Sequence, residues 1–207
     1  MLCIRVWVTN HLRLFAVIFV VSISSATLAQ NHELAVTFGG QIPVNASFDI
    51  DPGFAIQGSY AGRLLHVPLA SIYFEFPVVV GLKNEGLLPS FSGLERREYS
   101  SLFIAPGLKL KLAPEFPVSP YFTLGGGLAR FKLDATANSP EQTRNTSVIQ
   151  FGAGLDMKIA PFISLRGEVR DFYSGSLLEG PAALPGGGSI AGRQHNIVPS
   201  AGLVLRF

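Results

Sequence analysis

The sequence predicts an all-β fold, an eight-stranded antiparallel up-and-down transmembrane β-barrel. Apolar residues alternate with small or polar ones in eight separate runs, as expected for strands with one apolar face. Short and long breaks between the runs tend to alternate, as do the turns and loops of a membrane-spanning barrel. Although 48% of the chain is hydrophobic, no stretch after residue 29 approaches 18 consecutive apolar residues. The apolar surface is therefore expected on alternate strand positions.

Residues 1–29 have the three-part layout of a secretory signal peptide. Arg5 and Arg13 are the positive region, and an apolar run extends from Leu14 to Ile23. Thr27 and Ala29 are the small residues that such a cleavage site requires. We therefore expect export with cleavage near Ala29, and a single barrel domain over residues 30–207.

The charge and the thiol count change when this segment is removed. The chain has 16 basic and 14 acidic residues, and loss of Arg5 and Arg13 leaves 14 of each. A formally neutral chain gives no reason to expect a nucleic-acid partner. Cys3 and Trp7 are also lost, so no disulfide, thiolate metal site or cysteine nucleophile is expected. We expect no catalytic, cofactor-binding or metal-binding residues.

The first four expected strands span residues 33–42, 53–64, 70–83 and 99–112. Each has one bulky apolar face opposite residues such as Thr37, Gln57, Glu75 and Lys109. Segment 84–98, which is rich in charged residues, is expected to be a solvated loop. The outward apolar sets are Leu34, Val36, Phe38 and Ile42; Phe54, Ile56, Tyr60 and Leu64; Ile72, Phe74, Phe76, Val78, Val80 and Leu82; and Leu102, Ile104, Leu108, Leu110 and Leu112.

The next three expected strands span residues 121–131, 145–158 and 162–173, with loops at 132–144 and 174–192. Gly125, Gly127, Gly152 and Gly154, like Gly202 in the last run, fall on the inward face, where we expect them to leave room for larger interior side chains. The outward sets are Phe122, Leu124 and Leu128; Ile149, Phe151, Ala153, Leu155 and Met157; and Ile163, Leu165, Val169 and Tyr173.

The eighth run, residues 193–207, alternates apolar residues from Ile197 to Phe207 and stops on that aromatic residue. With the segments GGGLARF, FGAGLDMK and SLRGEVRDFYS, it resembles the bacterial outer-membrane barrel family of the OmpA, OmpX and opacity-like type. The resemblance implies that the assembly machinery reads Phe207 as a signal. It also implies periplasmic chaperones and outer-membrane lipid as partners.

Many charged residues of the runs fall on the inward faces, namely Arg63, Glu75, Lys109, Lys111, Asp156, Lys158, Arg166, Glu168, Arg170 and Arg206. A charge facing lipid at mid-depth would cost roughly 2–4 kcal/mol, so an inward position is favoured. We expect an interior network in which Glu75, Asp156 and Glu168 pair with Lys109, Arg166 and Arg170. Eight strands leave a bore that side chains can fill.

The expected function is that of an integral outer-membrane barrel with a structural or surface-interaction role. Its outer loops would meet an extracellular ligand, and we expect a monomer. The main alternative is a narrow porin-like channel for small solutes. A lipid-modifying enzyme is disfavoured because His195 is followed by Asn196 and Ile197, without a His-x-Ser pattern, and His32 and His66 fall at the periplasmic end. A soluble lipocalin-like carrier would need an apolar interior and a Gly-x-Trp motif, and residues 30–207 contain no tryptophan.

Overall fold

The computed structural model describes residues 31–44, 51–90, 93–135, 141–175 and 193–207. For residues 83–90, 93–97 and 193 the description covers the backbone alone. The expected signal peptide, residues 1–29, lies outside the described residues. In the part of the chain described, no helix is long and apolar enough to cross a membrane.

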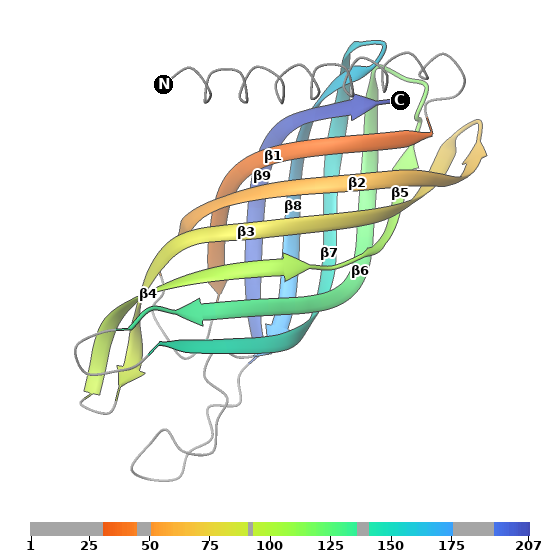
Figure 1. Ribbon diagram of the computed structural model, residues 1–207. Coiled ribbons are helices and arrows are strands. Elements are labelled where there is room, and N and C mark those ends of the chain that lie inside the picture. The colour runs from red at the N-terminus through yellow and green to blue at the C-terminus, as the bar shows by residue number, and fades with distance from the viewer. Residues whose placement is uncertain (1–30, 45–50, 91–92, 136–140, 176–192) are drawn as a thin grey trace, which may run out of the picture.

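The described chain is antiparallel β-structure, and the predicted fold class is confirmed (Figure 1). Each predicted run coincides with part of an observed strand and extends past its ends by at most two residues. The run 99–112 is divided between two strands. The strands are β1 (His32–Val44), β2 (Gly53–Val67), β3 (Ala70–Ser90), β4 (Gly93–Ile104), β5 (Gly107–Leu112), β6 (Val118–Leu133), β7 (Gln142–Ala160), β8 (Ile163–Gly175) and β9 (Arg193–Arg206).

The sheet closes into a barrel of eight wall positions, because β4 and β5 together fill one position between β3 and β6. The first and last strands, β1 and β9, pair and complete the ring. Cross-strand neighbours followed round the barrel from His32 return to β1 at Ile42, ten residues further along. This stagger tilts the strands, as closure of a small barrel requires.

The wall position shared by β4 and β5 is interrupted at Ala105 and Pro106. Pro106 has no backbone N–H to donate to a neighbouring strand. Ala105 N donates to Pro77 O over a long 3.5 Å, whereas Gly126 N donates to Pro106 O at 3.0 Å. The proline therefore accounts for the break, and β6 remains attached across it.

Two seams of the barrel depend on glycine. At the β1–β9 seam, a Cβ on Gly202 would collide with Val36 O and lie 2.6 Å from Thr37 Cα. At the opposite seam, a Cβ on Gly125 would lie 2.7 Å from the carbonyl oxygens of Ala105 and Pro106. Four wall positions separate the seams on each side, so the ring bends sharply at opposite places. In Figure 1, β1 to β4 accordingly cross in front of β6 to β9.

Glycine is required at the inward positions for two different reasons. Gly154 leaves room for side chains as expected, because its Cβ would lie 2.5 Å from the Tyr121 ring. A Cβ on Gly152 would meet both the Val169 carbonyl oxygen, at 2.8 Å, and Arg170 Cγ, at 2.9 Å. At Gly125, Gly127 and Gly202 the obstacle is instead the backbone of the neighbouring strand. The expectation of side-chain crowding was wrong for these three, because the bend of the sheet cannot be inferred from alternation.

The prediction that 84–98 is a solvated loop is also wrong. The β3–β4 ladder continues through this segment, from the pair Asn84 and Tyr99 to the pair Ser90 and Gly93. Pairing that starts in the barrel wall extends outward as a two-stranded ribbon, and polar composition does not oppose such a ribbon in water. Of the other expected loops, 132–144 is shortened by β6 and β7, and residues 136–140 and 176–192 lie outside the described residues.

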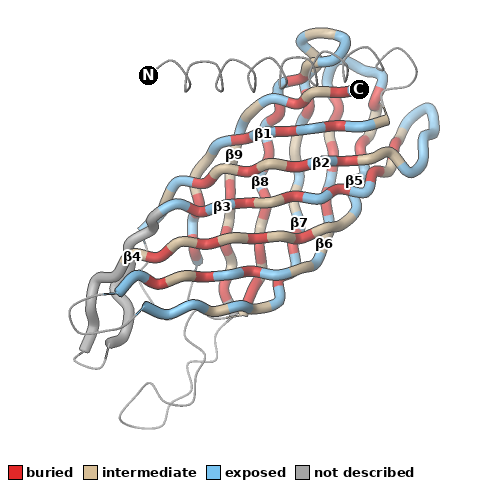
Figure 2. Tube along the Cα trace, in the orientation of Figure 1, coloured by how far each residue is buried: buried red, intermediate tan, exposed pale blue. Residues whose placement is uncertain are grey.

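The predicted facing of the strands is confirmed. Buried residues alternate with more exposed ones along the strands where side chains are described, except at residues 64–67 of β2, which are all exposed, and the banding in Figure 2 shows this. Leu34, Phe38 and Leu128 are outward and 45%, 51% and 65% exposed, whereas the intervening Ala35 and Thr37 are buried. The outer wall is therefore apolar, and the polar side chains are enclosed.

Candidate functional site

The interior of the barrel contains a buried charge network near the end where the chain terminates. Its carboxylates come from β1, β3, β7 and β8, and its cations from β5, β8 and β9. All are at most 6% exposed, and their alternate positions on the strands direct them inward. The members are Glu33, Glu75, Asp156 and Glu168, with Lys109, Lys111, Arg166, Arg170 and Arg206.

Arg170 joins two carboxylates from different strands. Its Nη1 and Nη2 atoms donate to both oxygens of Glu75 at 3.1 and 3.0 Å, and its Nε donates to Glu168 Oε2 at 2.8 Å. Glu168 also accepts from Tyr121 Oη at 2.7 Å and from Gln57 Nε2 at 2.7 Å. The carboxylate of Glu168 thus has a charged partner and neutral donors, which compensate its removal from water.

Arg166 forms the second centre. Its Nε and Nη2 atoms donate to the two oxygens of Asp156 at 2.7 and 2.9 Å. Its guanidinium carbon lies 4.7 Å from the centre of the Tyr121 ring. The planar guanidinium therefore uses both its edge and its face for contacts, which an ammonium group could not do.

Glu33 connects the two centres. It accepts a hydrogen bond from Lys109 Nζ at 2.6 Å, another from Lys111 Nζ, and a third from Arg166 Nη2 at 3.3 Å. Lys111 also lies 2.5 Å from Asp156 Oδ2. In the described part of the chain, five buried cations thus surround four buried carboxylates.

All six residues that the sequence assigned to an interior pairing network lie in the observed one. Asp156 contacts Arg166, whereas Glu75 and Glu168 both contact Arg170. Lys109 lies 3.7 Å from Glu75, and its closer partner is Glu33. Sequence reasoning missed Glu33, although its spacing from Ala35 and Thr37 placed it on the inward face. Lys111 and Arg206 were placed inward without partners.

The other half of the interior contains a large apolar cluster, which the sequence reasoning did not anticipate. Phe103 packs against Phe172 with ring centres 4.8 Å apart, and against Phe131 edge-on at 5.6 Å. Both contacts have geometries that aromatic pairs favour. The whole cluster is buried and consists of Ala55, Val79, Tyr99, Phe103, Ala105, Ala129, Phe131, Leu133, Val148, Phe172 and Val198.

A neutral polar chain lies inside the same half. Ser101 Oγ donates to Gln41 Oε1 at 2.7 Å, and Gln41 Nε2 donates to Asn196 Oδ1 at 3.1 Å. Gln194 Nε2 donates to the same Asn196 oxygen at 3.0 Å. A Cβ on Gly81 would meet Gln41 and Ser101, so this glycine leaves space for the chain of amides.

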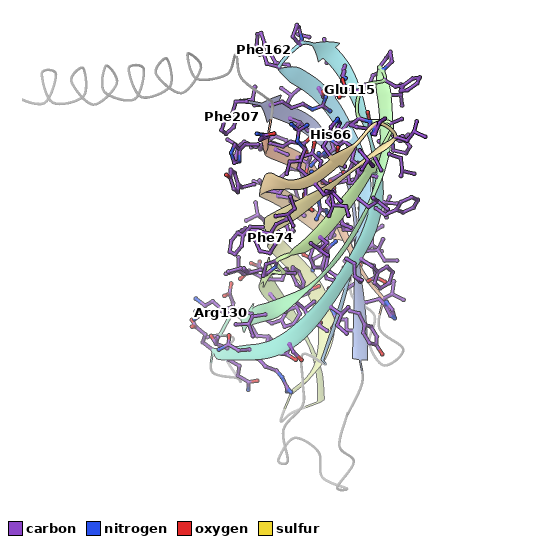
Figure 3. The ribbon with its side chains drawn as sticks, turned by 90° about the vertical axis from the view of Figure 1, so that its right-hand side faces the viewer. His66, Phe74, Glu115, Arg130, Phe162 and Phe207 are labelled. Atoms are coloured by element: carbon purple, nitrogen blue, oxygen red, sulfur yellow. The ribbon has the colours of Figure 1, made fainter. Side chains whose placement is uncertain are left out.

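The terminal Phe207 is part of the barrel wall. Its backbone N donates to His32 O at 3.0 Å, and its O accepts from His32 N at 2.9 Å. The two rings stack with centres 5.8 Å apart. Figure 3 shows Phe207 at the same end of the barrel as Phe162 and His66, with Arg130 toward the other end.

The histidines lie outside the charge network. His32 Nδ1 is 2.7 Å from Tyr60 Oη, and His66 Nδ1 is 2.8 Å from Ser71 Oγ. His195 lies toward the opposite end and contacts Asp171. Among the described residues, no group of three potential metal-ligating side chains occurs.

No protein-family model matches this chain, and no curated protein matches it. Solved structures do match. Neisserial surface protein A covers 86% of this chain and 98% of its own, with a TM-score of 0.60 and 14% identity. OprG of Pseudomonas aeruginosa covers the same shares, with a TM-score of 0.52 and 12% identity. Ail of Yersinia pestis covers 84% of this chain and 99% of its own, with a TM-score of 0.48 and 14% identity. The first two of these matches show that the chain has the fold of eight-stranded outer-membrane barrels.

Proposed function

We propose that this eight-stranded barrel is an integral protein of the bacterial outer membrane with a structural or surface-interaction role. In this role the barrel carries no solute and performs no chemistry. It holds the segments at its outer end in place at the membrane surface. The proposed extracellular contact is made by the β3–β4 ribbon and by segments 132–144 and 174–192.

The apolar outer wall is the observation that carries the proposal. Large apolar side chains on all eight wall positions are exposed, among them Phe38, Phe74, Leu128 and Leu155. Exposed apolar area on this scale is unfavourable in water and favourable in hydrocarbon. A closed sheet also leaves no backbone edge unpaired in lipid. A soluble carrier would need the opposite arrangement, with apolar residues inside and charges outside.

The filled interior supports a structural role over a channel. Arg166 and Arg170 are fully buried. Arg170 pairs with Glu75 on β3 across the bore, and Arg166 pairs with Asp156 on the adjacent β7. The aromatic cluster fills the other half. The charge network and the aromatic cluster fill successive parts of the bore. We therefore do not expect an open path for ions.

The proposed role is non-enzymatic. The three histidines of the described chain contact Tyr60, Ser71 and Asp171 on three separate parts of the wall. Nucleophilic catalysis needs a nucleophile and base within hydrogen-bond reach, with a third group that orients the base. His66 has both Ser71 and, at 3.9 Å from its Nε2, Glu115 as neighbours. This group is at the end of the barrel where the chain terminates, which in this proposal faces the periplasm.

The proposed route to the membrane begins with the signal peptide of residues 1–29, cleaved near Ala29. Periplasmic chaperones then hold the chain, and the assembly machinery reads Phe207 before β9 pairs with β1. The double hydrogen bond between Phe207 and His32 supports this order, because pairing uses the backbone of the terminal residue. We propose a monomer in outer-membrane lipid.

Electrophoretic mobility with and without boiling tests the proposal. The purified protein, refolded in detergent or lipid, should migrate as a compact band that boiling converts to a slower one. The same protein should precipitate when detergent is removed. A chain that stays monomeric and dispersed without detergent would contradict the membrane role.

A further inference from the structure

Asp171 and His195 lie side by side on the outer wall of the barrel, where charged groups are otherwise rare. On β8, Asp171 shares its outward face with Leu165 and Val169, whereas the adjacent Arg170 and Phe172 are buried. Its neighbours across the strands are Phe151 on β7 and Ile197 on β9. A carboxylate among apolar wall residues is unfavourable in lipid, so a function for it has to be considered.

The pair has a defined geometry. His195 Nδ1 is 2.6 Å from Asp171 Oδ2, and the His195 ring lies 4.7 Å from the ring of Tyr173. An ionised carboxylate can only accept, so Nδ1 is the donor. The Asp171 side chain is 15% exposed and that of His195 is 44% exposed. The imidazole, and not the carboxylate, is therefore the group that a ligand can reach.

We propose that His195, held by Asp171 and Tyr173, binds a hydroxyl group of a lipid head group at the outer end of the barrel. With Nδ1 engaged, the ring offers Nε2, which accepts a hydrogen bond when the ring is neutral and donates one when it is protonated. A hydroxyl group can be donor or acceptor, so it suits both forms. Acyl chains can be neither.

The position of the pair along the strands favours a head group over a chain. His195 is the third residue of β9, and Tyr173 is two residues before the end of β8. Tyrosine and histidine have an apolar body and a polar tip, and such residues occupy the boundary between hydrocarbon and head groups. The site rests on the proposed membrane location, because only lipid presents this ligand to the outer wall.

Imidazole nitrogen NMR on the full protein tests the site. The protein, labelled with ¹⁵N-histidine, is placed in phosphatidylcholine nanodiscs, and the His195 signals are assigned with His195→Gln. Three lipids are then added separately. Phosphatidylglycerol supplies glycerol hydroxyls, a neutral glucosyl diacylglycerol supplies sugar hydroxyls, and phosphatidylserine supplies negative charge without a hydroxyl.

The expected result is a shift of the His195 signals with one or both hydroxyl-bearing lipids, and none with phosphatidylserine. A shift with only one of them identifies glycerol or sugar as the source of the hydroxyl. Equal shifts with phosphatidylserine and phosphatidylglycerol, or no shift with any lipid, would overturn the proposal.

Asp171→Leu removes the group that fixes the ring. We expect it to abolish the lipid-dependent shift at His195 while the His32 and His66 signals stay unchanged. If this variant does not fold, the titration of the unmodified protein still decides. If the protein shows heat-modifiable mobility but its His195 signals do not shift with lipid, only the lipid site is contradicted. If the chain is soluble without detergent, the proposed function itself is contradicted.

Discussion

Arg170 stabilises the barrel because it is fully buried and still has partners for its charge. It connects β8 to Glu75 on β3, a strand on the other side of the bore. Removing one partner of such a group leaves the other charged and without compensation, which is more costly than the loss of the bond. The interior charges therefore depend on one another more than on the apolar residues around them.

Arg170→Met should lower the free energy of unfolding by about 3–5 kcal/mol, because Glu75 and Glu168 lose their nearest cation. Denaturant unfolding in lipid vesicles measures the change. Lys132→Met is the matched control, since Lys132 and Glu141 form an exposed pair at 3.1 Å and its loss should cost about 1 kcal/mol or less. Equal effects of the two substitutions would contradict this account of the interior.

Gly202→Ala should prevent closure of the barrel, because the added methyl group would collide with the backbone at Val36 and Thr37. The measurement is the fraction of protein that shows heat-modifiable mobility after refolding. Gly167→Ala is the control, since no heavy atom lies within 4 Å of the added Cβ, and it should fold as the unmodified chain does. Normal folding of Gly202→Ala would refute the tight seam between β1 and β9.

At the scale of the element, alternation along a strand determines which solvent each side chain meets. On β8, Ser164 is buried and Leu165 is 40% exposed, although they are adjacent in the chain. A shift of one residue would exchange the two faces and bring Arg166 and Glu168 to the outside. The register is therefore fixed by the charges as strongly as by the apolar residues.

Cysteine substitution on β8 should report this facing. Leu165→Cys in the reconstituted barrel should react with a lipid-soluble maleimide, whereas Ser164→Cys should not until the protein is unfolded. The only native cysteine, Cys3, falls in the expected signal peptide, so the processed chain provides a background without thiols. Reaction at both positions would mean that the interior is open to the reagent.

The β3–β4 ribbon is an element that neither its composition nor its charge predicted. Its pairing from Asn84 and Tyr99 outward predicts hydrogen-bonded amides within residues 85–90 and 93–98. Hydrogen exchange should therefore be slower in this segment than in an unstructured loop, and faster than in β3 over residues 72–80. Exchange at the rate of an unfolded peptide would restore the loop interpretation.

At the scale of the whole molecule, the barrel is two four-stranded walls joined at two glycine-dependent seams. The walls face each other across an interior with an ionic half and an aromatic half. The first half ties distant strands together by charge, and the second fills the bore by packing. Together they make the barrel a plugged cylinder.

In planar bilayers the reconstituted protein should show no steady conductance. The reason is that the buried ion pairs and the Phe103, Phe131 and Phe172 cluster occupy the bore at two successive levels. Phe103→Ala should lower the free energy of unfolding by about 3–5 kcal/mol through the cavity it creates, and still produce no steady channels, because the ionic half remains filled. Stable single-channel steps from the unmodified protein would favour the porin-like alternative.

The sequence alone determined the fold class, the number of wall positions and the facing of each strand. These follow from the two-residue alternation of apolar and polar side chains. This alternation is a local property that can be read from the polarity of each residue. The same parity placed Glu75, Lys109, Asp156, Arg166, Glu168 and Arg170 inside.

Only the tertiary structure decided which residues meet. Glu33 contacts Lys109 and Arg166 because the ten-residue stagger brings β1, β5 and β8 to the same depth, and a stagger is a property of the closed ring. The seams at Gly125 and Gly202, the aromatic half of the bore and the β3–β4 ribbon have the same origin. Each depends on contacts between residues far apart in the chain, and a local pattern contains no information about those distances.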